Sequence, residues 1–318
     1  RSPRIADKPG LKAVELFEAI GEGRVKAVWI IATNPVVSLP DADRVSAALA
    51  RCALVVSSDI VERTDTNAFA HVLLPALGWG EKNGTVTSSE RRISRQRPFL
   101  PAPGEARADW RAVCDVARHM GFEQGFGFAH PHEIFVEHAG LTAFRNHPPC
   151  ADGFPAAPRR LHLGALATLG RHAYDGLAPV QWPVTEDGRG TQRLFADGAF
   201  SHADGRARFV AVASRPPAHA IDREYPLVLN TGRIRDQWHT MTRTARSPRL
   251  NGHIGEPFVD MHPHDALRSG VRDGELARVS SRWGAMVARV RHGGGILAGS
   301  VFAPIHWNDQ FASDARVG

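Results

Sequence analysis

The stretch VKAVWIIATNPVVSLPDADRVSAALARCALVVSSD, residues 25–59, determines the fold class. It opens with the largely apolar run Val25–Ala32, which predicts a buried strand of a parallel sheet. Pro40 and Asp41 then begin a helix, because both residue types suit a helix start. A second apolar run, Ala53–Ser57, predicts the next strand. A strand, a helix and a strand within about 35 residues form a βαβ crossover, so the sequence predicts an α/β fold.

Similar apolar patterns continue on both sides of this stretch. Further predicted elements are a helix over residues 10–21, a short strand over His71–Leu74, and helices over Asp109–Gly121 and Pro131–Gly140. Asp109 is predicted to cap its helix. The residues of that helix predicted to face inward are Trp110, Val113, Val116 and Met120.

The composition changes after residue 144. Residues 145–222 are rich in Pro, Gly, His and Arg, and we expect linkers there with a single strand at Arg206–Val212. From residue 223 onward, the predicted elements are one helix, Pro263–Ser269, and four strands, Tyr225–Thr231, Glu275–Ser281, Ala285–Arg291 and Gly299–Ile305. Short strands with glycine-rich turns are typical of a small β-barrel. We therefore expect a partial parallel-sheet domain over 1–144, a linker and small β segment over 145–222, and a barrel domain over 223–318.

Composition and charge narrow the classes of function. Of 318 residues, 43% are hydrophobic and 23% are charged, which is typical of a globular protein. No apolar run approaches the roughly 18 residues of a membrane span, so none is expected. The net charge is +6, and only four of the 39 basic residues are lysines. The basic residues are scattered rather than gathered into a block, so we expect no nucleic-acid partner.

The cysteine and histidine patterns do not predict a metal site within this stretch. The three cysteines lie far apart without a CxxC pair, and Cys52 and Cys114 fall on apolar helical positions typical of small core residues. Two His-x-His pairs occur, His130/His132 and His262/His264. Each pair straddles a proline at a predicted helix start, which favours helix-entry histidines over metal ligands.

Polar residues follow both strands of the βαβ unit, at the edge where ligands bind in open α/β sheets. Asn34 comes shortly after the first strand, and Ser58 and Asp59 come directly after the second. A carboxylate matches the two adjacent donors of guanine or the hydroxyls of ribose, so Asp59 is a candidate for holding the nucleoside end of a cofactor. The alternative is that Asn34 and Asp59 only form turns, as these residue types commonly do.

The segment GEKNGTVT, Gly80–Thr87, contains an Asn-Gly pair between β-forming residues. Asn83-Gly84 therefore predicts a hairpin turn. Lys82 is one of the few lysines in an arginine-rich chain, and a compact ammonium suits a phosphate or a polar ring edge. The alternative is a solvated loop lysine.

The segment TGRIRDQWHTMTRT, residues 231–244, is dense in hydrogen-bond donors. It follows the predicted strand Tyr225–Thr231. Its backbone N–H groups, hydroxyls and guanidinium groups can be presented together to a polyanionic ligand. We therefore interpret it as a binding loop.

Several stretches together resemble one family. They are KAVWIIATNPVVSLPDADRV (26–45), VVSSDIVERTDT (55–66), LLPALGWGEKNGTVTSSERRISRQRPFLPAPGEARADW (73–110), PVQWPV (179–184) and NTGRIRDQWHTMTRT (230–244). From about residue 9 to its end, the chain resembles bacterial assimilatory nitrate reductase catalytic subunits, which are molybdopterin oxidoreductases of the dimethyl-sulfoxide-reductase superfamily.

The resemblance implies a partial Rossmann-like parallel sheet followed by a double-psi β-barrel that binds a molybdopterin dinucleotide. It implies a molybdenum cofactor held by two molybdopterin guanine dinucleotides. The cofactor-binding residues that it implies are Asn34, Ser58, Asp59, Lys82, Asp109, Thr231, Gly232, Arg233, Ile234, Arg235, Asp236, Gln237, Trp238, His239 and Thr240. It implies no catalytic residue and no metal ligand within this stretch, and His239 and Arg243 are candidates for a substrate channel.

The resemblance further implies an oxidoreductase that reduces nitrate to nitrite with electrons from a donor protein or domain. Its [4Fe–4S] cluster and its molybdenum ligand are expected upstream of Arg1, and further cofactor contacts are expected beyond Gly318. We therefore expect a cytoplasmic protein of which this chain is a fragment, inactive alone. The alternatives are a formate dehydrogenase or a periplasmic nitrate reductase of the same superfamily, or, in a different class, a non-catalytic nucleotide-binding module.

Overall fold

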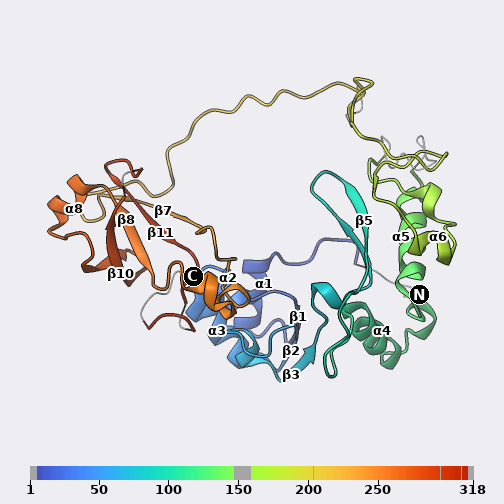
Figure 1. Ribbon diagram of the computed structural model, residues 1–318, viewed down its shortest axis with the longest axis horizontal. Coiled ribbons are helices and arrows are strands. Elements are labelled where there is room, and N and C mark those ends of the chain that lie inside the picture. Colours follow the sequence, from blue (N-terminus) through green and yellow to red (C-terminus); the bar gives the residue numbers. More distant parts are fainter. Residues whose placement is uncertain (1–5, 147–158, 203, 294, 309, 314–318) are drawn as a thin grey trace. The chain divides into compact units, whose positions relative to one another are not determined.

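The computed structural model describes residues 6–146, 159–202, 204–293, 295–308 and 310–313 (Figure 1). These residues form two compact units. The sheet-and-barrel unit joins Ala6–Ala76 to Arg215–Gly318, and the hairpin unit contains Leu77–Ser214. Among the described residues, none of the helices combines the length and apolarity that a bilayer crossing requires.

The first half of the sheet-and-barrel unit is a parallel sheet with helices. Its strands, in sheet order, are β1 (Ala27–Ile31), β2 (Leu54–Asp59) and β3 (Val72–Pro75). Its helical segments are α1 (Ala13–Gly21), α2 (Pro35–Ser38), α3 (Ala42–Arg51) and the 3-10 turn η1 (Asn67–Phe69). Ile20 of α1, Leu49 of α3 and Val55 of β2 are buried together in its core. The predicted βαβ crossover and the α/β class are confirmed.

The start of α3 follows from its sequence. Asp41 is the residue before the helix, and its carboxylate accepts a hydrogen bond from the Arg44 N–H at 3.3 Å. This bond satisfies one of the backbone donors that a helix start leaves unpaired. Val45, Ala48 and Leu49 then bury one face of the helix, and the predicted core residue Cys52 is buried just after its end.

A curled five-stranded mixed sheet forms the second half of this unit. Its strands, in chain order, are β7 (Val228–Gly232), β8 (Phe258–Met261), β9 (Leu276–Ser281), β10 (Gly284–His292) and β11 (Ser300–Pro304). The sheet order is β7-β11-β8-β10-β9, with β7 parallel to β11 and β8 parallel to β10. The predicted C-terminal β-barrel fold is confirmed in the form of this curled sheet. Strand β8 is absent from the predicted strands, because four residues that include Asp260 carry little periodicity.

Helix α8 (Pro263–Ser269) covers this sheet with the bounds that the sequence predicts. It ends at Gly270, whose φ of +71° is the left-handed conformation that glycine adopts without strain. Ala266 of the helix packs with Val290 and Ala303 in the core. The segment before β8 contains the 3-10 turn η5 (Thr244–Arg246) and the short helix α7 (Pro248–Asn251).

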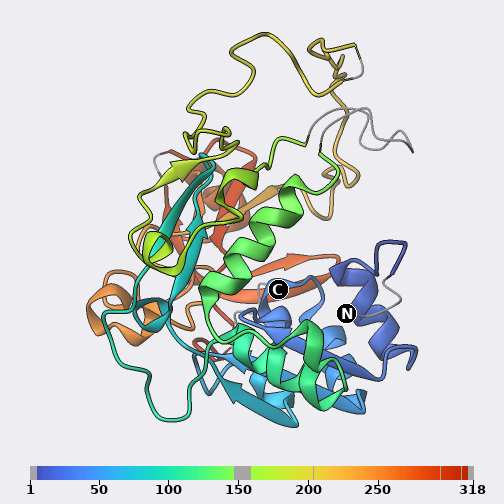
Figure 2. The same cartoon turned by 90° about the vertical axis from the view of Figure 1, so that its right-hand side faces the viewer.

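The hairpin unit packs an antiparallel sheet against helices (Figure 2). Its strands are β4 (Gly84–Thr87), β5 (Arg92–Gln96) and β6 (Val180–Gln181). Its helices are α4 (Asp109–His119), α5 (Pro131–Ala143) and α6 (Arg171–Asp175). Its 3-10 turns are η2 (Trp79–Glu81), η3 (Glu123–Gly125) and η4 (Gly164–Leu166). Ile93 of β5, Phe135 of α5 and Tyr174 of α6 share one buried cluster.

Two predictions about local structure are wrong. Asn83-Gly84 does not form the hairpin turn, since Gly84 is the first residue of β4 and the turn to β5 lies at Ser88–Arg91, where Arg91 has a φ of +71°. Arg206–Val212 does not form a strand. Its apolar side chains lack a covering layer, and Phe209 is 98% exposed. A strand needs a neighbouring backbone as well as a suitable pattern.

Helix α4 also differs from its prediction. Its buried residues are Cys114 and Ala117, whereas Val116 and Met120, predicted to face inward, are exposed. Asp109 is the first helical residue and does not cap the helix through its side chain, because it pairs with a lysine instead. Helix α5 continues past Gly140 to Ala143.

The interpretation of both His-x-His pairs as helix-entry residues is confirmed. The Nδ1 atoms of His130 and His262 accept hydrogen bonds from the N–H groups of His132 and His264, at the starts of α5 and α8. These bonds satisfy backbone donors of the first helical turn. Burial, followed by the nearby Arg171 charge, lowers the pKa of His130, so its imidazole stays neutral and can accept this bond.

Candidate functional site

The carboxyl edge of the parallel sheet gathers the first predicted site residues. Strands β1 and β2 are in register with Ile31 opposite Ser58, so the chain leaves both strands at the same edge. Asn34 follows β1, and Asp59 is the last residue of β2. The structure therefore brings Asn34, Ser58 and Asp59 to one edge, as the strand pattern predicts.

Asn34 connects the segments at this edge through side-chain hydrogen bonds. Its side chain is buried, and its Oδ1 accepts hydrogen bonds from the Thr66 N–H at 3.2 Å and the Thr66 hydroxyl at 2.6 Å. Its Nδ2 lies 3.5 Å from Oδ2 of Asp65, and Nδ2 of Asn308 lies 3.5 Å from the same oxygen. Asp65 thus connects the edge of the parallel sheet to the segment after β11.

The side chains of Ser58 and Asp59 have internal partners. The buried Ser58 hydroxyl accepts a hydrogen bond from the Trp29 indole N–H at 2.9 Å. Oδ1 of Asp59 accepts one from the Val61 N–H at 3.0 Å. The predicted turn role of Asp59 is confirmed by this bond, and its role toward a nucleoside stays a prediction.

Lys82 and Asp109 meet in the hairpin unit. The Lys82 ammonium lies 2.9 Å from Oδ2 of Asp109, and both side chains are about one-third exposed or less. The other carboxylate oxygen, Oδ1, is buried and has no hydrogen-bond partner among the residues that the structure describes. A buried carboxylate oxygen without a donor is costly, so this atom is an open acceptor for a ligand N–H group.

A network that the sequence does not predict holds the loop next to Lys82. The Arg95 guanidinium is 3% exposed and donates hydrogen bonds to the Gly84 carbonyl and, at 2.9 Å, to Oδ1 of Asn83. It also lies 4.1 Å from the centre of the Tyr174 ring. Arginine is rarely buried without partners, and nothing in the spacing of β5 marks this one as buried.

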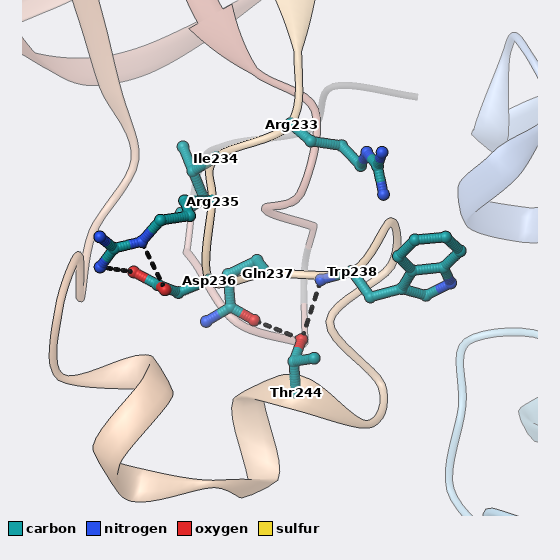
Figure 3. Close-up of a pocket in the computed structure, with 7 residues that line it drawn as sticks. All are labelled: Arg233, Ile234, Arg235, Asp236, Gln237, Trp238 and Thr244. Carbon is teal, nitrogen blue, oxygen red and sulfur yellow. Dashed lines mark hydrogen bonds and ion pairs between the residues drawn. The ribbon is translucent and has the colours of Figure 1, made fainter.

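The predicted binding loop, residues 231–244, leads out of β7 and borders a pocket of about 430 Å³ (Figure 3). We call its first part, Thr231–Thr240, the donor loop. That volume lies within the range of small-molecule sites. The pocket is lined by Arg233, Ile234, Arg235, Asp236, Gln237, Trp238 and Thr244. Thr244, the last residue of the predicted binding loop, supports the donor loop by hydrogen bonds. Its hydroxyl accepts a hydrogen bond from the Trp238 N–H at 3.1 Å and donates one to Oε1 of Gln237.

Charged groups lie on both sides of the donor loop. Arg235 and His253 each approach the Asp236 carboxylate to 2.9 Å, and these bonds, that of Arg235 foremost, lower the pKa of Asp236. On the opposite side in Figure 3, the Arg233 guanidinium lies 4.6 Å from the centre of the Trp238 ring. Arg233 makes no ion pair within the described part of the chain, so it can receive an anion. The Trp238 ring also stacks on His239 at 4.4 Å.

His306 is a further residue of this region that the sequence analysis does not single out. Its side chain is fully buried, with Nε2 2.9 Å from the Ile234 N–H nitrogen and Nδ1 2.7 Å from the His239 carbonyl oxygen. Its position between Ile305 and Trp307, after the apolar strand β11, is the signal that indicates burial. His239 and Arg243, the candidates for a substrate channel, are both exposed.

Two family models match the chain. The model of the molybdopterin oxidoreductases matches residues 4–119, and that of the molydopterin dinucleotide binding domain matches residues 227–317. The chain belongs to the molybdopterin oxidoreductases. The second matched region contains the curled sheet and the donor loop.

The chain is similar to nitrate reductases. It is 55% identical over 316 residues to a nitrate reductase of Klebsiella oxytoca. This alignment covers 99% of this chain and 35% of that protein. It is 31% identical over 308 residues to the assimilatory nitrate reductase catalytic subunit of Bacillus subtilis, covering 95% of this chain and 40% of that protein. The chain therefore spans 35–40% of the length of these two relatives.

A solved structure shares the fold of this molybdopterin oxidoreductase. The chain superposes on acetylene hydratase from Pelobacter acetylenicus with a TM-score of 0.70 over 96% of this chain and 41% of that chain. The identity is 16%, so the likeness concerns the fold alone.

Each unit offers groups whose chemistry suits a part of a molybdopterin dinucleotide. Pterin and guanine rings carry N–H donors, for which the buried Oδ1 of Asp109 is an open acceptor. The dinucleotide carries phosphates, for which Arg233, beside the pocket, offers a guanidinium without an ion pair among the described residues. The predicted residues fall in both units: Lys82 and Asp109 in the hairpin unit, and the remainder in the sheet-and-barrel unit.

Proposed function

We propose that the chain is part of a nitrate reductase and that its residues bind the molybdopterin guanine dinucleotide arms of a molybdenum cofactor. The observation that carries the proposal is the 55% identity to a nitrate reductase over nearly the whole chain. The predicted barrel over 223–318 and the partial Rossmann-like domain over 1–144 are the proposed binding domains, joined by the segment 145–222.

The residues have distinct proposed roles. Asp59 and the open Oδ1 of Asp109 accept hydrogen bonds from ring N–H donors. Arg233, Lys82 and the backbone N–H groups of the donor loop bind phosphate oxygens. Asn34 and Ser58 keep the sheet edge in place, as their internal hydrogen bonds indicate. When bound, the molybdenum cofactor supplies the two-electron chemistry that converts nitrate and two protons into nitrite and water.

The chain contributes binding and electrostatics to that reaction. The side chains of His239 and Arg243 are exposed beside the donor loop. We include in the proposal that they add positive potential along the path of nitrate, which concentrates an anionic substrate. Asp109 holds the Lys82 ammonium in one position. From this position the ammonium orients a phosphate or a polar ring edge of the cofactor.

The proposal extends to the remaining family properties. These are a second molybdopterin guanine dinucleotide, a [4Fe–4S] cluster and an electron-donor protein or domain. A cytoplasmic location is supported by the likeness to an assimilatory catalytic subunit.

The test uses the protein encoded by the native gene that contains these residues, purified from cells supplied with molybdate. We expect a bound pterin, detected by fluorescence after oxidative release, and nitrate reduction with reduced methyl viologen as the artificial donor. Bound pterin with formate oxidation and no nitrate reduction replaces the proposal by a formate dehydrogenase. A protein without pterin and without molybdenum overturns it and favours the non-catalytic nucleotide-binding module.

A further inference from the structure

His306 bridges two distant points of the donor loop. It lies directly after β11, which pairs in parallel with β7, and this pairing continues through the bond from the Ile305 N–H to the Gly232 carbonyl at 3.0 Å. The His306 ring then accepts a hydrogen bond from the Ile234 N–H through Nε2 and donates one to the His239 carbonyl through Nδ1. One side chain therefore holds both the start and the end of the loop.

The two bonds require one particular form of the imidazole. Nε2 accepts from an N–H group and must be unprotonated, whereas Nδ1 faces a carbonyl oxygen and must carry the proton. Only the neutral ring with its proton on Nδ1 satisfies both. Since the side chain is 0% exposed, water cannot replace either bond, and losing one leaves a buried backbone group unpaired.

The surroundings of His306 favour this neutral form. Burial lowers its pKa, and the bond to the His239 carbonyl offsets only part of that effect. The charged and titratable groups that act on it are Arg233 and His239, both on the donor loop. On the other side, Trp307 and Met241 form an apolar cluster, with the Trp307 ring 6.2 Å from the imidazole.

The loop has few other bonds that fix its backbone. Between the end of β7 and η5, the regular backbone pairing stops, and the Met241 N–H to Trp238 carbonyl bond at 2.8 Å makes a single turn. Of the groups proposed to meet the phosphates, Arg233 directly precedes the first point that His306 holds, and the N–H groups of residues 235–237 lie between the two points. Fixing a binding loop before the ligand arrives lowers the entropic cost of binding.

We propose that His306 is a positioning residue, a neutral double hydrogen-bonding latch that fixes the donor loop in its binding conformation before the dinucleotide binds. This inference rests on the proposed function of the donor loop, because the loop is taken as the dinucleotide site. The latch itself is a property of the protein without cofactor. It acts through the backbone of Ile234 and His239 and needs no contact between the imidazole and the ligand.

Three variants separate the two bonds. His306→Gln carries its terminal amide oxygen near the position of Nε2 and keeps the acceptor for Ile234. His306→Asn carries its amide N–H near the position of Nδ1 and keeps the donor to His239. His306→Phe keeps an aromatic ring at this position and removes both hydrogen bonds. Trp307→Phe is the matched control, since Trp307 is equally buried in the adjacent cluster and leaves both latch bonds intact.

The first readout is hydrogen exchange of the loop backbone in cofactor-free native protein, resolved to the Ile234 amide. We expect protection in the unsubstituted protein, in His306→Gln and in Trp307→Phe, and loss of protection in His306→Asn and His306→Phe. Protection relative to the intrinsic rate also falls at low pH in the unsubstituted protein, as the imidazole takes up a proton, and does not fall in His306→Gln. If His306 only filled space in the core, His306→Gln and His306→Asn would not differ in the protection of the Ile234 amide.

The second readout is the pterin content of the protein purified from molybdate-supplied cells. We expect a loss of at least about tenfold in retention for His306→Phe, since it leaves two buried backbone groups unpaired, and little loss for Trp307→Phe. Unchanged Ile234 exchange in His306→Phe overturns the latch, and so does an equal effect of Trp307→Phe. If the unsubstituted protein holds no pterin while the exchange results stand, the proposed function fails and the latch does not.

Discussion

Lys82 and Asp109 form an ion pair with Nζ 2.9 Å from Oδ2, although 27 residues separate them in the sequence. The pair joins the loop before β4 to the first turn of α4. It also leaves Oδ1 of Asp109 buried without a donor in the described part of the chain. The two groups that the sequence analysis names separately therefore act as one unit, a fixed cation beside an open acceptor.

The substitution Asp109→Asn tests this arrangement. We expect pterin retention to fall about tenfold, because the carboxylate, which holds Lys82 and is proposed to accept the ligand N–H, loses its charge. The free energy of unfolding should change by less than about 1 kcal/mol, since a partly exposed ion pair contributes little. Pterin release and urea unfolding measure the two quantities.

Glu90→Gln is the control for Asp109→Asn. It removes the partner of Arg92, an exposed ion pair in the same unit, and should leave pterin retention unchanged. If Asp109→Asn retains pterin as well as Glu90→Gln does, the open oxygen has no role in binding.

Local patterns allow prediction of much of this fold and of where the loops proposed to bind the cofactor lie. The bounds of α8 follow from Pro263 and Gly270, and the donor-rich composition indicates the donor loop before any contact is known. The wrong predictions depend on tertiary context. The Asn83-Gly84 pair is held by Arg95 from the next strand, so it cannot turn the chain there. The bonds of Arg95 and His306 join residues distant in sequence, and no local spacing encodes them.

Arg95 should be the most costly single cation to remove from the hairpin unit. Its guanidinium is 3% exposed and bonds Asn83, Asp175 and the Gly84 carbonyl. Arg95→Gln leaves these groups without their donor, and we expect a loss of about 3 kcal/mol in the free energy of unfolding. Arg92→Gln, on the same strand but 41% exposed, should cost less than about 0.5 kcal/mol. Equal losses of unfolding free energy for the two variants would show that the buried bonds of Arg95 contribute no more to stability than the exposed pair of Arg92.

Two glycines of the barrel half should respond oppositely to alanine. Gly270 ends α8 with a φ of +71°, and Gly270→Ala forces a left-handed alanine that costs roughly 1–2 kcal/mol. At Gly284, the first residue of β10, an added Cβ meets nothing within 4 Å and the φ is not in the left-handed range. Gly284→Ala should be neutral or stabilising by up to about 1 kcal/mol. Thermal unfolding of both variants measures this, and destabilisation by Gly284→Ala would show that the conformation there is special.

The lowered pKa of His306 predicts how stability depends on pH. Above its ordinary value of 6.5, the ring is neutral in both the folded and the unfolded chain, and its contribution to stability is complete. Below pH 6.5 the imidazole of His306 is protonated in the unfolded chain but stays neutral in the folded chain. The free energy of unfolding therefore decreases as the pH is lowered, until the pH reaches the lowered pKa of the folded chain. The slope in that window approaches about 1.4 kcal/mol per pH unit. His306→Gln lacks this component, whereas His130, whose pKa is also lowered, contributes equally to both proteins and cancels. Urea unfolding at a series of pH values should therefore give a difference between the two proteins that shrinks as the pH falls below 6.5, and a constant difference would mean that folding does not lower the pKa of His306.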